Sequence, residues 1–254
     1  MAVATGGGVI PDIPPGTGAD AARALFEAAG WRVIGEGDWA TALADPSDEI
    51  CARIVPFDPA YRIFADEVLA GPPNRFLPRI DAILPLARDG YVVLMQRLWP
   101  VDEALAHSFC DALGPLDGRR DPPPPSGLFT GADDPDLLRL IARVKAMLAT
   151  GAARYRLWGG SDVRVGQILR TRDGGLKLVD PVYLAGYDIV AAIQAGDAGA
   201  LADFTRAQLE DFLTIAAFRR GEDNADPDGG LRAALDRLDL TPRPAGSGDQ
   251  AGPE

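Results

Sequence analysis

The chain has 254 residues, 47% of them hydrophobic, with 37 acidic against 25 basic side chains and a formal net charge of −12 at pH 7. This length fits one large domain or two lobes that share a cleft, and the apolar fraction supports a sizeable core. The acidic balance argues against a nucleic-acid partner, because that kind of binding depends on clustered positive charge. It does not exclude a nucleoside triphosphate, which a few local arginines and backbone N–H groups can hold.

Both ends of the chain are expected to lack packed structure. Residues 1–17 are rich in Gly and Pro, and residues 222–254 form an acidic, Pro/Gly-rich tail with a helical pattern only at 229–238. There is no run of about 18 apolar residues, and the first residues lack the charged start and apolar core of a signal peptide. We therefore expect a soluble, cytoplasmic protein with no membrane partner.

Residues 18–98 predict a lobe built on an antiparallel sheet. Short segments with period-two patterning alternate with turns, and one stretch between them is apolar at helical spacing. The expected elements in chain order are a helix at 19–29, a strand–turn–strand unit at 31–42, a strand at 49–55, a helix at 61–69 and strands at 81–86 and 90–96.

Residues 99–221 predict a mainly helical lobe that contains one β-hairpin. The expected helices, each with a period near 3.6, lie at 101–113, 134–150, 185–194 and 198–219, and the hairpin lies at 154–182. The proline run at 121–126 excludes regular structure and is interpreted as a surface loop, with a recognition segment for a proline-binding module as the alternative.

Two acidic residues of the hairpin carry the main functional signal. Residues 162–169 read DVRVGQIL and residues 176–181 read LKLVDP, so each segment places an aspartate at the end of a short apolar strand. Taken singly, Asp162 and Asp180 are ordinary turn residues. Brought together by a hairpin with the amide of Gln167 between them, they suit Mg²⁺ on a nucleotide's phosphates, while the first Asp orients a hydroxyl.

The strand–turn–strand unit near the N-terminus carries a second signal. Gly35 and Gly37 form a Gly-x-Gly turn that permits the tight backbone of a phosphate-covering loop, although an ordinary hairpin turn uses the same residues. The next strand carries Arg53, and the helix that follows carries Glu67.

In this order, the motifs resemble those of the protein-kinase-like superfamily over about residues 30–220. The resemblance is to its aminoglycoside-phosphotransferase-type members and to small kinase-like proteins of bacteriophages and bacteria. It implies a bilobal α+β fold, with an N-terminal antiparallel sheet carrying one helix and a short, mainly helical C-lobe.

The resemblance also implies a role for each candidate residue. Asp162 would align the substrate hydroxyl, Arg164 would neutralise the transferred phosphoryl group, and Gln167 and Asp180 would bind Mg²⁺. Glu67 or Asp66 would pair with Arg53 to direct it toward the phosphates. The positions implied to bind ATP are Gly35, Gly37, Ala52, Arg53, Glu67, Met95 (in the hinge beside adenine) and Leu169.

Three of the family's phosphate and metal positions depart from its pattern in this chain. Arg53 stands where the family has Lys, Gln167 where it has Asn, and Ala40 where it has a third Gly. The resemblance therefore leaves several functions open. One is an ATP- and Mg²⁺-dependent phosphotransferase acting on a protein Ser/Thr or small-molecule hydroxyl. Another is a degenerate pseudokinase that binds a nucleotide or a protein, and a third is transfer of the nucleotide itself.

Overall fold

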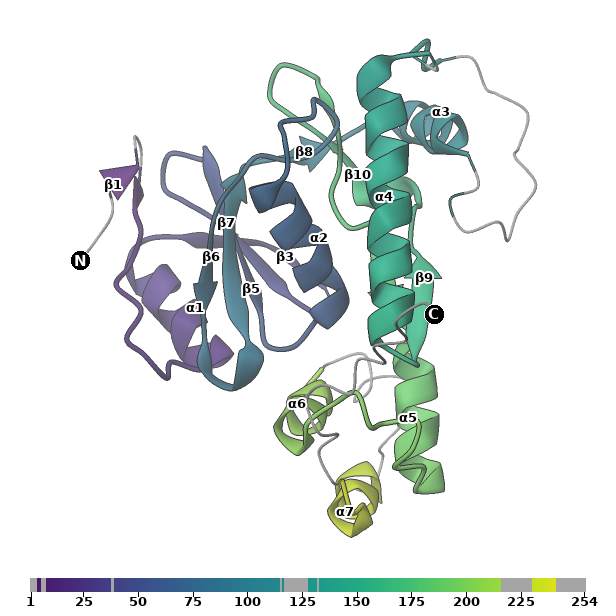
Figure 1. Ribbon diagram of the computed structural model, residues 1–254. Coiled ribbons are helices and arrows are strands. Elements are labelled where there is room, and N and C mark those ends of the chain that lie inside the picture. The colour runs from purple at the N-terminus through teal and green to yellow at the C-terminus, as the bar shows by residue number, and fades with distance from the viewer. Residues whose placement is uncertain are drawn as a thin grey trace, which may run out of the picture.

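The structure is a computed structural model that describes residues 4–5, 8–37, 39–114, 116, 128–131, 133–215 and 230–240. The N-terminal half is built on a five-stranded sheet in the order β3-β4-β5-β7-β6 (Figure 1). Every neighbouring pair in this sheet is antiparallel, which confirms the predicted architecture. The strands are β3 (Arg32–Glu36), β4 (Thr41–Ala44), β5 (Ile50–Val55), β6 (Ile80–Pro85) and β7 (Tyr91–Gln96).

Helices α1 (Ala19–Ala28) and α2 (Pro59–Ala70) cover opposite faces of this sheet (Figure 1). Side chains alternate along β5, so Ala52 joins the buried cluster of Phe26 on α1, whereas Val55 joins the cluster of α2. The α1 cluster also contains Ile10. The expectation that residues 1–17 are loosely attached is therefore wrong for Ile10, because Trp31 draws this segment in by donating its indole N–H to the Val9 carbonyl at 3.2 Å.

Helix α2 also contacts the C-terminal half through α4 (Pro135–Arg154). Arg143 on α4 donates to the main-chain carbonyls of Glu67 at 2.6 Å and Pro72 at 2.8 Å, where α2 ends. Its Nε also pairs with the Glu67 carboxylate at 3.0 Å. One α4 side chain thus binds both the last turn of α2 and the residue Pro72 that follows it.

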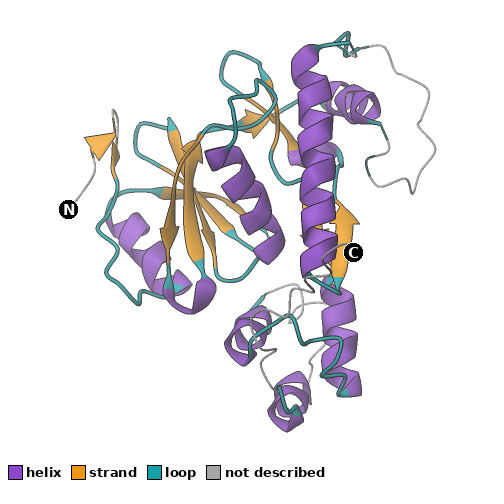
Figure 2. Ribbon diagram, viewed as in Figure 1, coloured by secondary structure: helices purple, strands orange, loops and turns teal. Residues whose placement is uncertain are grey.

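The C-terminal half is mainly helical, with short strands between the helices (Figure 2). Its helices are α3 (Glu103–Leu113), α4, α5 (Gly186–Ala195), α6 (Arg206–Phe212) and α7 (Gly230–Arg237). The short strands are β8 (Trp99–Pro100), β9 (Trp158–Ser161), β10 (Ile168–Arg170), β11 (Leu176–Leu178) and β12 (Val182–Leu184), and a further pair, β1 (Ala4–Thr5) and β2 (Gly8–Val9), lies at the N-terminus. The fold class is α+β, as predicted.

One helix is shorter than its sequence pattern indicated. The expected helix at 198–219 is only α6, because Thr205 begins a new helix with a capping box to Gln208. Upstream, the Asp197 carboxylate accepts a hydrogen bond from the Ala200 N–H and holds a turn instead of a helix. Residues 216–219, the proline run and the tail after 240 lie outside the described residues.

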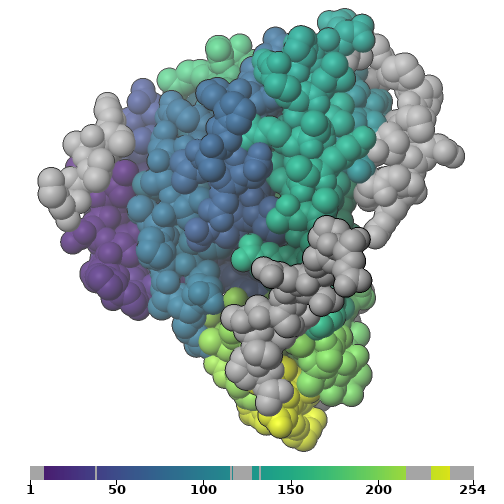
Figure 3. Space-filling model, in the orientation of Figure 1, coloured from purple at the N-terminus to yellow at the C-terminus, as the bar shows by residue number. Residues whose placement is uncertain are grey.

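The two halves meet along α2 and α4, and in the space-filling view the blue surface of α2 lies against the teal surface of α4 (Figure 3). The main buried cluster contains residues of both halves, such as Val93 from the sheet and Leu137 from α4. Within the described ranges, no helix combines the length and apolarity needed to cross a membrane.

Candidate functional site

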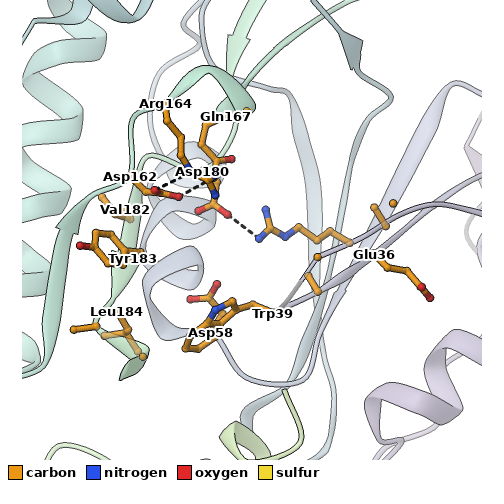
Figure 4. Close-up of a pocket in the computed structure, with 18 of the residues that line it drawn as sticks. Glu36, Trp39, Asp58, Asp162, Arg164, Gln167, Asp180, Val182, Tyr183 and Leu184 are labelled. Carbon is orange, nitrogen blue, oxygen red and sulfur yellow. Dashed lines mark hydrogen bonds and ion pairs between the residues drawn. The ribbon is translucent and has the colours of Figure 1, made fainter. Parts of the chain in front are cut away.

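A cavity of about 850 Å³ lies between the β3–β4 turn and the hairpin of the C-terminal half. Figure 4 shows Asp162, Arg164, Gln167 and Asp180 gathered on one side of it, with Trp39 and Asp58 nearby. The residues that line the cavity include Gly35, Gly37, Trp39, Arg53, Asp58, Asp162, Arg164, Gln167, Asp180, Tyr183, Tyr187 and Asp188.

The hairpin brings Asp162 and Asp180 to the same cavity through backbone pairing. Strand β10 pairs with β11, and β9 pairs with β12, so the two acidic segments run side by side. The Asp162 N–H donates to the Pro181 carbonyl at 2.8 Å, and the Val179 N–H donates to the Gln167 carbonyl at 3.0 Å. The predicted separation of the two carboxylates, about 4–8 Å for two ligands of one ion, stays a prediction.

Both carboxylate oxygens of Asp162 have partners. Oδ1 accepts from Arg164 Nε at 3.0 Å, and Oδ2 accepts from Gln167 Nε2 at 2.8 Å (Figure 4). Gln167 therefore turns its amide nitrogen, not its oxygen, toward the acid. The Arg164 side chain is 66% exposed, so its bond to Asp162 is the one most open to exchange with a ligand.

Arg53 pairs with Asp180, not with Glu67. Its Nη2 lies 2.8 Å from Asp180 Oδ2, and its guanidinium carbon lies 3.5 Å from the centroid of the Tyr61 ring. The expected pair of Arg53 with Glu67 or Asp66 is wrong, because Glu67 binds Arg143 and Asp66 binds Arg62. Tyr61 and Glu67 are six residues apart on α2, roughly 240° around the helix, so the face that presents Tyr61 to Arg53 turns Glu67 away.

Asp58 is a buried acid of the cavity that the sequence analysis did not place there. It is only 8% exposed, and its carboxylate caps α2 by accepting from the Tyr61 N–H at 2.9 Å. Burial, together with the charge of Asp180, raises the pKa of Asp58 to about 7. Burial also raises the pKa of Asp180, although Arg53 opposes the rise. In the sequence, an Asp before Pro59 signals only the start of a helix.

Four positions predicted to bind ATP do not line the cavity: Ala52, Glu67, Met95 and Leu169. Ala52 faces α1 on the other side of the sheet, and Leu169 pairs with Pro100. Met95 is buried in the core, where its sulfur lies 3.7 Å from the Tyr61 hydroxyl.

The segment after Met95, where a hinge was expected, has its backbone donors engaged. The N–H of Gln96 donates to the Arg79 carbonyl at 3.0 Å, and the N–H of Arg97 donates to the Glu49 carbonyl at 2.8 Å. A base placed at the hinge would have to compete with these two bonds. Of the predicted ATP-binding positions, the structure brings Gly35, Gly37 and Arg53 to the cavity.

Aromatic side chains also reach the cavity. The ring centroid of Trp39 lies 6.3 Å from that of Phe57 and 5.6 Å from that of Phe212 on α6, which fixes the tip of the β3–β4 turn against the C-terminal half. Tyr183 and Tyr187, at 41% and 67% exposed, lie where the chain leaves the hairpin for α5. Nothing in their sequence context distinguishes them from surface tyrosines.

The side chains expected to bind Mg²⁺ are not arranged as ligands of that ion. An Asp180 oxygen is bound by Arg53, and the amide nitrogen of Gln167 donates to Asp162. Among the residues that the structure describes, no group of three or more His, Cys, Asp or Glu side chains is placed to hold a metal ion. The Mg²⁺ site expected at Gln167 and Asp180 would require both side chains to change partners.

Comparison with known proteins gives similarity only to solved structures. No family model matches the chain, and no curated protein matches it. The chain is similar to a crystal structure of aminoglycoside phosphotransferase APH(4)-Ia, with 12% identity over 84% of this chain and 86% of that one and a TM-score of 0.31. It is also similar to a thermostable mutant of that enzyme in a ternary complex with AMP-PNP and hygromycin B, with 12% identity, 84% and 95% coverage and a TM-score of 0.32. At this level of similarity, the ligands and substrates of those proteins are not assigned to this chain.

Proposed function

We propose that this chain is a phosphotransferase that uses ATP as phosphoryl donor. The observation that carries the proposal is the convergence of a glycine turn, an arginine and two aspartates on one cavity: Gly35 and Gly37, Arg53, Asp162 and Asp180. These groups come from both halves of the molecule. Phosphoryl transfer depends mainly on positioning and on cationic groups that stabilise the phosphate charge, which is what such a set supplies.

Asp162 is the residue we assign to the acceptor hydroxyl. Its Oδ1 is held by the exposed Arg164, so a substrate hydroxyl that donates to Asp162 can replace that bond at small cost. Arg164, which lines the same cavity, would then be released to bind the transferred phosphoryl group. The acceptor is a hydroxyl of a protein Ser/Thr or of a small molecule. No step of this proposal runs through Mg²⁺, because the donors do not fit the ion.

The test is ATP consumption by the purified chain, with phosphoryl transfer followed from γ-labelled ATP. Asp162→Asn should lower the rate by about 10²–10⁴-fold, the usual contribution of a residue that aligns and accepts a proton. Asp66→Asn is the matched control, since Asp66 pairs with Arg62 on an exposed face of α2, and it should keep the full rate. Unchanged turnover in Asp162→Asn, or no turnover in the unmodified chain, would contradict the proposal.

A second candidate is a nucleotide-binding module that transfers nothing. It is favoured by two pairs, Arg53 with Asp180 and Gln167 with Asp162, which engage the side chains expected to act in catalysis. The same experiment separates the two functions, because the module binds ATP with no consumption above the Asp162→Asn background.

A further inference from the structure

Arg53 is a cation that lines the cavity. Its strand, β5, is central in the sheet, and its guanidinium is held by Asp180 at 2.8 Å and by the face of the Tyr61 ring at 3.5 Å. The side chains of Arg53 and Asp180 are only 19% and 15% exposed, so the pair is shielded from solvent and from screening by salt.

The guanidinium of Arg53 is bound to the carboxylate that was expected to bind a metal ion. Asp180 is the carboxylate at the metal position of the hairpin, and Arg53 holds one of its oxygens. The neighbouring carboxylate is also paired, since Asp162 accepts hydrogen bonds from both Arg164 and Gln167. A divalent ion on Asp180 would have to displace Arg53 or lie beside a like charge in a poorly solvated place.

We propose that Arg53 takes the place of the metal ion, so that the cavity binds the phosphates of a nucleotide directly on this side chain without a divalent cation. The inference rests on the nucleotide-binding part of the proposed function. Arg53 binds Asp180 through Nη2, and its planar guanidinium carries five N–H donors, more than this one bond uses, so it can also donate to phosphate oxygens. Arg164 is a second cation at the same cavity.

This assignment changes the role of Asp180 from ligand to counter-ion. If Asp180 held a metal that binds phosphates, loss of its charge would weaken nucleotide binding. If Asp180 only neutralises Arg53, loss of its charge frees the guanidinium and removes a repulsive carboxylate, so anion binding becomes tighter. The two roles predict effects of opposite sign for one substitution.

The experiment is calorimetric titration of the full chain with ATP, and separately with tripolyphosphate, in buffer containing either Mg²⁺ or EDTA. We expect the Kd for ATP to agree within about threefold between the two buffers, and tripolyphosphate to bind in EDTA. Asp180→Asn should tighten ATP binding about tenfold, and Arg53→Met should weaken it about 100-fold.

Two further variants control for the unpaired charge that Arg53→Met leaves and for the loss of an arginine in general. Arg53→Met alone leaves Asp180 buried without its partner, so the double variant Arg53→Met/Asp180→Asn restores charge balance, and it should still bind ATP more weakly than the unmodified chain. Arg79→Met makes the same replacement at an arginine that is 61% exposed, where it pairs with Asp81, and it should bind ATP as the unmodified chain does.

Each other outcome points to a different failure. ATP binding that tightens tenfold or more with Mg²⁺, or that weakens in Asp180→Asn, overturns this inference and leaves the proposed phosphotransferase intact. Equal binding in both buffers without any ATP consumption supports the inference and contradicts the proposed function. Failure of ATP and tripolyphosphate to bind in either buffer overturns both.

Discussion

At the scale of single residues, the cavity brings opposite charges together in a place with little solvent. Asp58 and Asp180 share one cation, Arg53, whose hydrogen bond goes to Asp180. Asp58 keeps its position by capping α2, and its pKa rises because it is buried near a second carboxylate. The charged form of Asp58 is therefore favoured by its role as a helix cap and disfavoured by its burial near Asp180.

This conflict predicts a pH dependence of stability. Because the pKa of Asp58 is raised from its ordinary value to about 7, the folded chain holds a proton that the unfolded chain has lost between about pH 4 and pH 7. The free energy of unfolding should therefore fall as pH rises through this window. Asp58→Asn keeps a good cap without the charge, and above pH 7 it should be more stable than the unmodified chain by on the order of 1–3 kcal/mol.

Denaturant unfolding at a series of pH values measures this difference. The control is Asp102→Asn, which changes an exposed capping Asp at the start of α3 and should alter stability by less than about 0.5 kcal/mol throughout. An Asp58→Asn variant whose advantage does not grow from pH 4 to pH 7 would contradict the assignment.

At the scale of elements, α2 is the helix that joins the two halves. Its buried face packs on the sheet, its N-terminus is capped by Asp58, and its C-terminus is held by Arg143 from α4. Gly71 is required there, because a Cβ at this position would lie 2.7 Å from the Glu67 carbonyl oxygen and would also meet the Arg143 guanidinium. The capping contacts at the end of α2 are therefore contacts between halves as well.

Removal of this cap should be costly although the residue lies far from the cavity. Arg143→Ala removes hydrogen bonds to two carbonyl groups from a side chain that is 12% exposed, and it should lower the free energy of unfolding by about 1–3 kcal/mol. Arg139→Ala, one turn earlier on α4 and 60% exposed, removes only a bond to Asp136 and should cost less than about 0.5 kcal/mol. Equal losses in the two variants, measured by urea unfolding, would show that the carbonyl contacts contribute nothing.

At the scale of the whole molecule, both halves share one buried cluster. Phe57 beside the sheet and Phe212 of α6 belong to the same cluster, and Trp39 packs against both rings. On the outer side, Arg88 in the β6–β7 turn pairs with Glu210 of α6 at 2.5 Å. These contacts lie at different points of the boundary between the halves.

We therefore expect thermal unfolding to be a single transition. Tryptophan fluorescence and far-UV circular dichroism should give the same midpoint, because neither half keeps its core when the other unfolds. Arg143→Ala should lower both midpoints equally. Two separated transitions, or a shift in only one probe, would mean that the halves fold as independent domains.

The sequence by itself determined the architecture and the main acidic pair. Period-two patterning and turn residues predicted the antiparallel sheet, and the hairpin between Asp162 and Asp180 predicted that both acids reach one place. These features follow from local spacing, which the chain carries wherever its partners lie. The start of α6 was less predictable, because a turn and a capping box replaced the first part of a continuous helical pattern.

Only the tertiary structure decided which charges pair. Arg53 pairs with Asp180 and not with Glu67, because α2 presents Tyr61 to Arg53 and directs Glu67 toward Arg143. The orientation of helix and strand also explains why Asp58 lines the cavity although it was not predicted to, and why Met95 and Ala52 do not line it although they were. Pairing across 127 residues depends on how a helix is rotated and which face of a strand is turned inward, and sequence spacing does not specify that rotation for distant partners.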